Sequence, residues 1–213
     1  MTLAKICGIN SPAAAVAAAA GGAAHIGLVF YPPSPRSVSA ETAAELARLV
    51  PERVGRVGLF VDPADDELQA VLSRVPLTML QLHGSESPER IAAIKHRFGL
   101  KVMKAIGVAG PGDLDAATAY AAVSDWLLFD AKPPKEPGAL PGGNARPFDW
   151  RILQGRSWPL PWMLSGGLTA GTLGEAVRIT GAPVVDVSSG VEDRPGVKNP
   201  DRIRAFLEAA ARL

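Results

Sequence analysis

The sequence predicts an α/β protein, a (β/α)8 TIM barrel that occupies residues 1–213 as a single domain. Short apolar runs of strand-forming residues alternate along the whole chain with runs rich in Ala, Leu and charged residues. The strand runs are almost continuously apolar, as at 57–61 and 126–129, which is typical of parallel strands covered on both faces. Eight such pairs fit within the 213 residues, and no linker divides them. An open doubly wound sheet is the alternative arrangement.

The predicted elements follow one another in a regular order. Strands are predicted near residues 3–6, 25–29, 54–61, 78–81, 100–106, 125–129, 161–164 and 183–187. Helices are predicted near residues 12–20, 39–49, 65–73, 88–97, 111–122, 147–153, 169–178 and 200–211. A cap residue followed by Pro, at 11–12, 87–88 and 199–200, marks the start of three helices. Ser39 followed by Glu41 marks a weaker start, in which the acidic side chain suits the first turn.

Charge and composition narrow the range of partners. The chain has 22 Lys and Arg against 21 Asp and Glu, so its formal net charge is +1. It therefore lacks the field of one sign that would favour nucleic acid or an anionic membrane as the main partner. The single Cys excludes an intrachain disulfide. The three histidines, His25, His83 and His96, are too widely spaced in the sequence to match a common metal-binding motif.

The N-terminal region shows no sign of export or membrane insertion. The first residues lack the long apolar stretch of a secretory signal peptide. The Ala-rich run at 13–20 lies between Pro12 and Gly21, and it is too short and too weakly apolar to span a bilayer. With 47% hydrophobic residues, the chain has enough apolar material for one sizeable core. A cytoplasmic protein is therefore expected.

Polar and Gly-rich residues gather at the ends of the predicted strands. The active site of a (β/α)8 barrel lies at this end, where each strand passes into the following loop. The residues concerned are Cys7, Gly8, 31–37, Asp62, 81–84, Asp130, 165–167 and 186–190. A long segment rich in Pro, Gly and Lys, 132–146, follows the sixth strand. Such a loop predicts a lid over the site, and a surface insertion is the alternative.

Two of these strand ends suggest a phosphate site. Ser165-Gly166-Gly167 follows the seventh strand, and Ser188-Ser189-Gly190 follows the eighth. Glycine lets backbone N–H groups approach a ligand closely, and barrels often bind phosphate with these two loops. The sequence therefore favours a phosphorylated substrate, although ordinary tight turns would explain the same residues.

Four other side chains are candidates for binding or chemistry. Arg36 has a guanidinium suited to a carboxylate or phosphate, unless it is a solvated surface residue. His83 is either a ligand-facing donor or a core histidine. Asp130 ends an apolar strand, where a carboxylate needs a purpose or a partner. Cys7 and Asp130 would act as base and acid if they face each other across the barrel mouth, whereas a lone Cys is often only a small buried apolar residue.

Seven motifs in order give the chain a resemblance to a known family. They are KICG at 5–8, GLVFYPPSPR at 27–36, VGLFVD at 57–62, LQLHG at 80–84, FDAK at 129–132, LSGGL at 164–168 and VDVSSGVE at 185–192. Together they cover almost the whole chain, and most lie at strand ends. On these residues the sequence resembles the phosphoribosylanthranilate isomerases of tryptophan biosynthesis.

The resemblance implies a (β/α)8-barrel isomerase that performs an Amadori rearrangement without metal or organic cofactor. The implied substrate is N-(5-phosphoribosyl)anthranilate, and the product is 1-(2-carboxyphenylamino)-1-deoxyribulose 5-phosphate. Asp130 would be the general acid, Cys7 the general base, and Arg36 the partner of the anthranilate carboxylate. Gln81 and His83 would contact the substrate. The implied phosphate-binding residues are Gly166, Gly167, Asp186, Ser188, Ser189 and Gly190. The chain would act as a monomer or a homodimer on this small-molecule phosphosugar.

Two positions depart from the family pattern. Ala145 stands where a third Gly is usual, which affects the expected conformation of the 132–146 loop. Thr169 stands where Asn is frequent, and it is still expected to cap the following helix.

Three other functions remain open at this point. An aldose–ketose isomerase of histidine synthesis would be expected to carry Asp in place of Cys7. An indole-glycerol-phosphate synthase relative would be expected to use Lys and Glu at strand ends; Lys5 and Lys104 lie in strands without a matching Glu. A barrel that only binds a phosphorylated metabolite is the third alternative.

Overall fold

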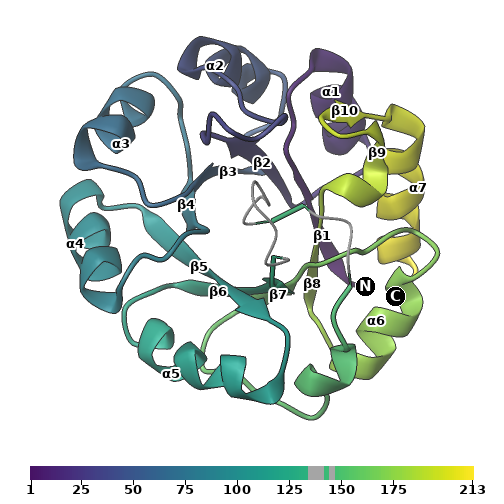
Figure 1. The fold of residues 1–213 in the computed structure, drawn as a ribbon. Helices are drawn as coiled ribbons and strands as arrows, with labels where there is room; N and C mark the ends of the chain where they lie inside the picture. Colours follow the sequence, from purple (N-terminus) through teal and green to yellow (C-terminus); the bar gives the residue numbers. More distant parts are fainter. Residues whose placement is uncertain (134–141, 144–146) are drawn as a thin grey trace.

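Eight parallel strands close into a barrel in the computed structural model, which describes residues 1–133, 142–143 and 147–213 (Figure 1). The strands are β1 (Leu3–Cys7), β2 (His25–Val29), β3 (Gly55–Phe60), β4 (Met79–Leu82), β5 (Lys101–Val108), β6 (Trp126–Ala131), β7 (Trp162–Leu164) and β8 (Val184–Val187). They pair in chain order, and β1 pairs with β8. The barrel prediction is therefore confirmed, and an open sheet is excluded.

Helices surround the barrel and cover its outer face (Figure 1). They are α1 (Pro12–Ala20), α2 (Ala40–Arg48), α3 (Asp65–Leu72), α4 (Pro88–Phe98), α5 (Ala116–Ala121), α6 (Leu173–Thr180) and α7 (Pro200–Ala211). The side chains of Ser11, Ser39, Ser87 and Asn199 accept backbone N–H groups at the starts of their helices, as predicted. No helix in the described residues is long and apolar enough to cross a membrane.

Three predicted helices differ from the structure. The segment at 147–153 forms only a short 3-10 helix, η2 (Trp150–Leu153). The helix at 111–122 begins as the 3-10 helix η1 (Pro111–Asp115), and the α-helix follows only from Ala116. The helix at 169–178 begins four residues late, at Leu173. Thr169 does not cap it; its Oγ1 accepts the N–H of Thr172 at 3.3 Å and closes a preceding turn.

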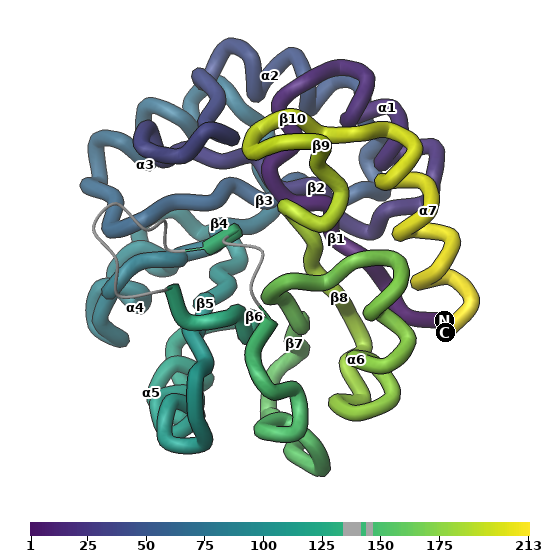
Figure 2. Tube along the Cα trace, turned by 45° about the vertical axis from the view of Figure 1, so that its right-hand side comes forward, coloured from purple at the N-terminus to yellow at the C-terminus, as the bar shows by residue number. Residues whose placement is uncertain are grey.

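A small hairpin after β8 was not predicted. The 3-10 helix η3 (Ser189–Val191) leads into β9 (Glu192–Arg194), which pairs antiparallel with β10 (Val197–Lys198). Pro195 and Gly196 form its turn, and the φ of +81° at Gly196 explains the glycine. Figure 2 shows the hairpin near α1 and α7 and the two chain ends side by side, where Thr2 N–H donates to the Ala210 carbonyl.

Strand residues alternate between two cores. Ile6, Leu28 and Phe60 belong to the core between barrel and helices, whereas Val57, Met103 and Met163 pack together inside the barrel. Since Ile6 points outward, Lys5 and Cys7 on either side of it point into the barrel. The inner face of β1 therefore carries two polar side chains that lead to the carboxyl end of the barrel.

The amino end of the barrel holds His25, which contacts Trp126 edge to face at 6.0 Å. Its Nδ1 atom is buried without a hydrogen-bond partner among the described residues. Burial and the nearby charge of Lys5 lower the pKa of His25 to about 4, although Asp186 opposes them. The imidazole is therefore neutral in the folded protein over the physiological range.

We expect His25 to make the fold sensitive to mild acid. Because its pKa is lower in the folded state than in the unfolded state, the unfolded state takes up the proton first as the pH falls below about 6.5. The free energy of unfolding should drop by about 2 kcal/mol between pH 7 and pH 5 from this group, and the loss should level off below pH 4. Urea unfolding at both pH values, compared between wild type and His25→Gln, measures the difference.

The control is His96→Gln, which alters an exposed imidazole on α4. This variant should keep the full decrease in stability. An equal decrease in the His25→Gln variant would show that the acid sensitivity arises elsewhere.

Candidate active site

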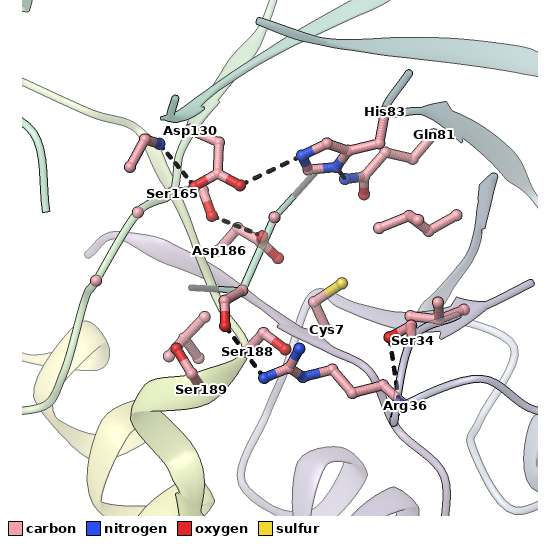
Figure 3. A pocket seen from close by; sticks show the side chains of 18 of the residues that line it. Cys7, Ser34, Arg36, Gln81, His83, Asp130, Ser165, Asp186, Ser188 and Ser189 are labelled. Carbon is pink, nitrogen blue, oxygen red and sulfur yellow. Dashed lines mark hydrogen bonds and ion pairs between the residues drawn. The ribbon is translucent and has the colours of Figure 1, made fainter. Parts of the chain in front are cut away.

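One pocket at the carboxyl ends of the strands collects nearly all the predicted site residues. Cys7, Arg36, Gln81, His83, Asp130, Gly166, Gly167, Asp186, Ser188 and Ser189 line it, whereas Gly190 does not. Figure 3 shows Gln81, His83 and Asp130 on one side, and Cys7 and Arg36 on the other. Residues that are up to 182 positions apart in the sequence, Cys7 and Ser189, therefore share one site.

The two Gly-rich turns that were predicted to bind phosphate lie against each other. Gly166 and Gly167 have φ values of +92° and +67°, and both line the pocket together with Ser188 and Ser189. A Cβ atom added to Gly190 would lie 1.9 Å from the carbonyl oxygen of Leu168. Gly190 therefore acts from outside the pocket, because its missing side chain lets the two turns pack together.

A row of three hydrogen-bonded polar side chains, Gln81, His83 and Asp130, forms one side of the pocket. Oδ2 of Asp130 lies 3.3 Å from Nε2 of His83, and Nδ1 of His83 lies 2.9 Å from the Gln81 amide nitrogen. Oδ1 of Asp130 accepts the N–H of Ala131 at 2.8 Å. Gln81 and His83 therefore position the Asp130 carboxyl group. Both also line the pocket, and their contact with a substrate stays a prediction. The Gln81 amide donates to Nδ1, which leaves the proton on Nε2 to be donated to Asp130.

Cys7 lies on the other side of the pocket and is buried. Burial raises the pKa of its thiol, the charge of Asp186 adds to the rise, and the charges of Lys5 and Lys198 oppose it. The thiol therefore carries its proton at neutral pH. A base at this position needs a local positive charge before it can act.

Asp186 has both carboxylate oxygens engaged within the protein. Oδ1 accepts the Lys5 ammonium at 2.8 Å, and Oδ2 accepts the Ser165 hydroxyl at 3.0 Å. A carboxylate repels a phosphate, so only the backbone of Asp186 remains suitable for the predicted phosphate role. Its side chain belongs to a buried ion pair.

Arg36 is buried, which excludes a solvated surface role. Its Nε and Nη2 atoms donate to the two oxygens of Glu192, each at 2.8 Å, and Nη2 also approaches the Gly143 carbonyl at 3.3 Å. Among the described residues, this pairing leaves the Nη1 edge of the guanidinium without a partner, and that edge suits a ligand. Burial acts to raise the pKa of Glu192, but Arg36 and Lys198 outweigh it and the pKa is lowered.

Lys198 joins the ion pair of Arg36 and Glu192 to the turn at 188–190. Its ammonium donates to Oε1 of Glu192 at 2.7 Å and to the backbone oxygen and hydroxyl of Ser188 at 2.9 and 3.1 Å. Burial lowers the pKa of this lysine, although Glu192 opposes the shift. Two cations thus share one carboxylate at the pocket wall, and the excess positive charge suits an anionic ligand.

Three charged residues of the site, Lys5, Glu192 and Lys198, were not predicted from the sequence. Their type gave a signal, because charged residues beside apolar strands must be paired when buried. Lys104 is different: it points out of the barrel and pairs with Glu86 at 2.5 Å. It therefore does not supply a lysine to the pocket.

From the 132–146 loop, Gly142 and Gly143 line the pocket, and Ala145 lies outside the described residues.

The fold and the pocket define a barrel enzyme with a carboxyl group and a thiol on opposite sides of one substrate site. The model of the family described as N-(5'phosphoribosyl)anthranilate (PRA) isomerase matches residues 4–209. The chain belongs to this family. The N-(5'-phosphoribosyl)anthranilate isomerase of Rhodospirillum centenum is 62% identical over 209 residues, which cover 98% of each chain. That of Paramagnetospirillum magneticum is 59% identical over 206 residues, 97% of this chain and 95% of the relative.

Solved structures agree with this assignment. The phosphoribosyl anthranilate isomerase of Thermotoga maritima is 35% identical, covers 100% of both chains and has a TM-score of 0.87. A member of the family in complex with reduced 1-(o-carboxyphenylamino)-1-deoxyribulose 5-phosphate is 33% identical, again over 100% of both chains, with a TM-score of 0.83.

The contact at Gly190 leads to a prediction. In Gly190→Ala the new methyl group must push the two turns apart, so the free energy of unfolding should fall by about 1–3 kcal/mol. Competitive inhibition by inorganic phosphate should weaken in parallel. Gly171→Ala is the matched control, because its Cβ would have only the Thr169 hydroxyl at 3.9 Å nearby. Equal stability and equal phosphate inhibition in the two variants would contradict the assignment of these turns.

Proposed function

We propose that this chain converts N-(5'-phosphoribosyl)anthranilate to 1-(2-carboxyphenylamino)-1-deoxyribulose 5-phosphate, with Asp130 as general acid and Cys7 as general base. The observation that carries the proposal is the shared pocket, in which a hydrogen-bonded carboxyl group faces a buried thiol in a chain of this family. The reaction is an aldose–ketose isomerisation of tryptophan biosynthesis. It moves protons within one molecule, so it requires one acid and one base.

The acid step opens the ribose ring. Asp130 gives its proton to the ring oxygen while the bond between that oxygen and C1 breaks. The anthranilate nitrogen supplies an electron pair to C1 and forms an iminium ion. His83 supports this step, because its Nε2 atom lies 3.3 Å from the Asp130 carboxyl group and stabilises the carboxylate left behind.

The base step moves the double bond. The Cys7 thiolate removes the proton from C2, and the electron pair of that C–H bond flows to the iminium nitrogen to give an enolamine. Protonation at C1 and loss of the proton from the C2 hydroxyl then give the ketone. The iminium ion takes up the electron pair by itself, so the chemistry requires neither a metal ion nor an organic cofactor.

The ends of the substrate are placed by charge. The anthranilate carboxylate fits the Nη1 edge of Arg36, which lines the pocket beside Gly143. The phosphate fits the backbone of the turns at 166–168 and 188–190. This arrangement makes a small anionic phosphosugar the partner of the chain.

A Thermotoga maritima relative is described as dimeric, which supports the homodimer among the two predicted states. Cytoplasmic localisation stays a prediction.

Genetic complementation and kinetics test the proposal together. The wild-type chain should restore growth without tryptophan to a bacterium that lacks this isomerase, and Cys7→Ser and Asp130→Asn should not. Each substitution should lower kcat by about 10²–10⁴-fold, because each removes one proton-transfer group. A reduced product analogue should still bind both variants with nearly the wild-type Kd.

Two results would count against these roles. A kcat within about threefold of wild type for Cys7→Ser, far below the usual effect of a general base, would leave Cys7 as a packed core thiol. A loss of analogue binding equal to the loss of kcat would show that the two residues are structural.

A further inference from the structure

Lys5 is completely buried inside the barrel, beside the proposed base. Its ammonium pairs with Oδ1 of Asp186 at 2.8 Å, and its side chain has 0% exposure. Lys5 and Asp186 are also register partners across β1 and β8, the strand pair that joins the first and last strands of the barrel. The ion pair therefore lies at the seam that closes the barrel, directly below the pocket.

The same ammonium reaches Cys7. Lys5 and Cys7 are two residues apart on one strand, so their side chains share the inner face of β1. The positive charge of the Lys5 ammonium acts on the Cys7 thiol and lowers its pKa against the effect of burial. Gly27 on the neighbouring strand makes room for this sulfur, since a Cβ atom there would lie 2.8 Å from it. The ammonium is thus fixed by the Asp186 carboxylate inside the barrel, on the face of β1 that also carries the thiol.

We propose that Lys5 is a positioning residue whose ammonium stabilises the Cys7 thiolate, and that Asp186 and Ser165 hold it in place for this purpose. The inference deepens the proposed function, because it rests on Cys7 being the base that removes the C2 proton. It also gives the Asp186 side chain a role other than phosphate binding.

Stability alone does not explain why the buried pair of Lys5 and Asp186 is charged. Two desolvated charges often contribute less than apolar side chains of the same volume. Val184, two residues before Asp186 on β8, and its register partner Met163 belong to an apolar cluster inside the barrel, so the interior next to the ion pair accepts apolar packing. A role for the ammonium charge in the site explains why residue 5 is a lysine and not an apolar residue.

Other charged groups face Cys7 from the surrounding elements. Arg36 after β2 and Lys198 on β10 are cations, but both are paired with Glu192 on β9. Asp186 on β8 faces the thiol from the same side as Lys5, and Asp130 and His83 lie across the pocket. Burial raises the pKa of the Cys7 thiol, and the Lys5 charge is the largest effect that lowers it. The pKa of Lys5 itself is raised, because Asp186 and Cys7 outweigh its burial.

The chain has one Cys, so alkylation by iodoacetamide reports on Cys7 alone. The rate of alkylation against pH gives the thiol pKa without any catalytic assay. In Lys5→Met, which keeps the length of the side chain and removes its charge, we expect this pKa to rise by at least about one unit. The alkylation rate at pH 7 should fall about tenfold, and the limb of the kcat–pH profile that reports the base should shift upward by the same amount.

Asp186→Asn should have the opposite effect on the thiol. It removes a negative charge that opposes the thiolate and leaves the ammonium to Cys7, so the thiol pKa should fall. A merely structural pair would not give opposite shifts in its two variants. If a single substitution prevents folding, the double variant Lys5→Met with Asp186→Asn removes both charges. Its thiol pKa should still lie above wild type, because the charge of Lys5 acts on the thiol more strongly than that of Asp186.

Lys104→Met is the matched control. Lys104 is buried and paired with the Glu86 carboxylate in the same way, but on the outer side of the barrel. The Lys104→Met variant should be less stable than wild type, and its thiol pKa should be unchanged. An unchanged pKa in Lys5→Met, or shifts of the same sign in Lys5→Met and Asp186→Asn, would overturn the inference. Failure of the proposed function is a separate result, since it would appear as an active Cys7→Ser variant.

Discussion

The pairing of β1 with β8 is the constraint on which the rest of the structure depends. It closes the barrel and brings residue 5 beside residue 186 in register. Without this closure, Cys7 at the start of the chain would not share a pocket with Ser188 and Ser189 near its end. The Lys5–Asp186 ion pair lies at this seam, so the contact that closes the barrel also places a positive charge near Cys7, the proposed base.

Charge is distributed around the pocket in two paired groups. Lys5 and Asp186 form a balanced pair below the thiol, whereas Arg36 and Lys198 share the single carboxylate of Glu192. The second group therefore carries excess positive charge at the pocket wall. A substrate with a carboxylate and a phosphate would complete the pairing, which explains how so many buried charges are tolerated.

Much of the fold and of the site could be predicted from the sequence. Apolar strand runs and polar strand ends are local patterns, and the strand order of a barrel follows the chain. The pairs that organise the site are not local. Lys5 and Asp186 are 181 residues apart, and Arg36 and Glu192 are 156 apart, so their contacts emerge only when the barrel closes. The helix predicted at 147–153 forms only the 3-10 helix η2, because a local sequence pattern does not show whether packing extends one turn into an α-helix.

The central claim is that the Asp130 carboxyl group, the Cys7 thiol and the two anion-binding sites all contact one substrate molecule, bound in a single orientation. A crystal structure with the reduced product analogue tests it most directly. The account predicts phosphorus between the turns at 166–168 and 188–190, the carboxylate at Nη1 of Arg36, and C2 within about 3.5 Å of the Cys7 sulfur. An analogue bound in reverse, with its phosphate at Arg36 and its C2 atom away from Cys7, would contradict the account.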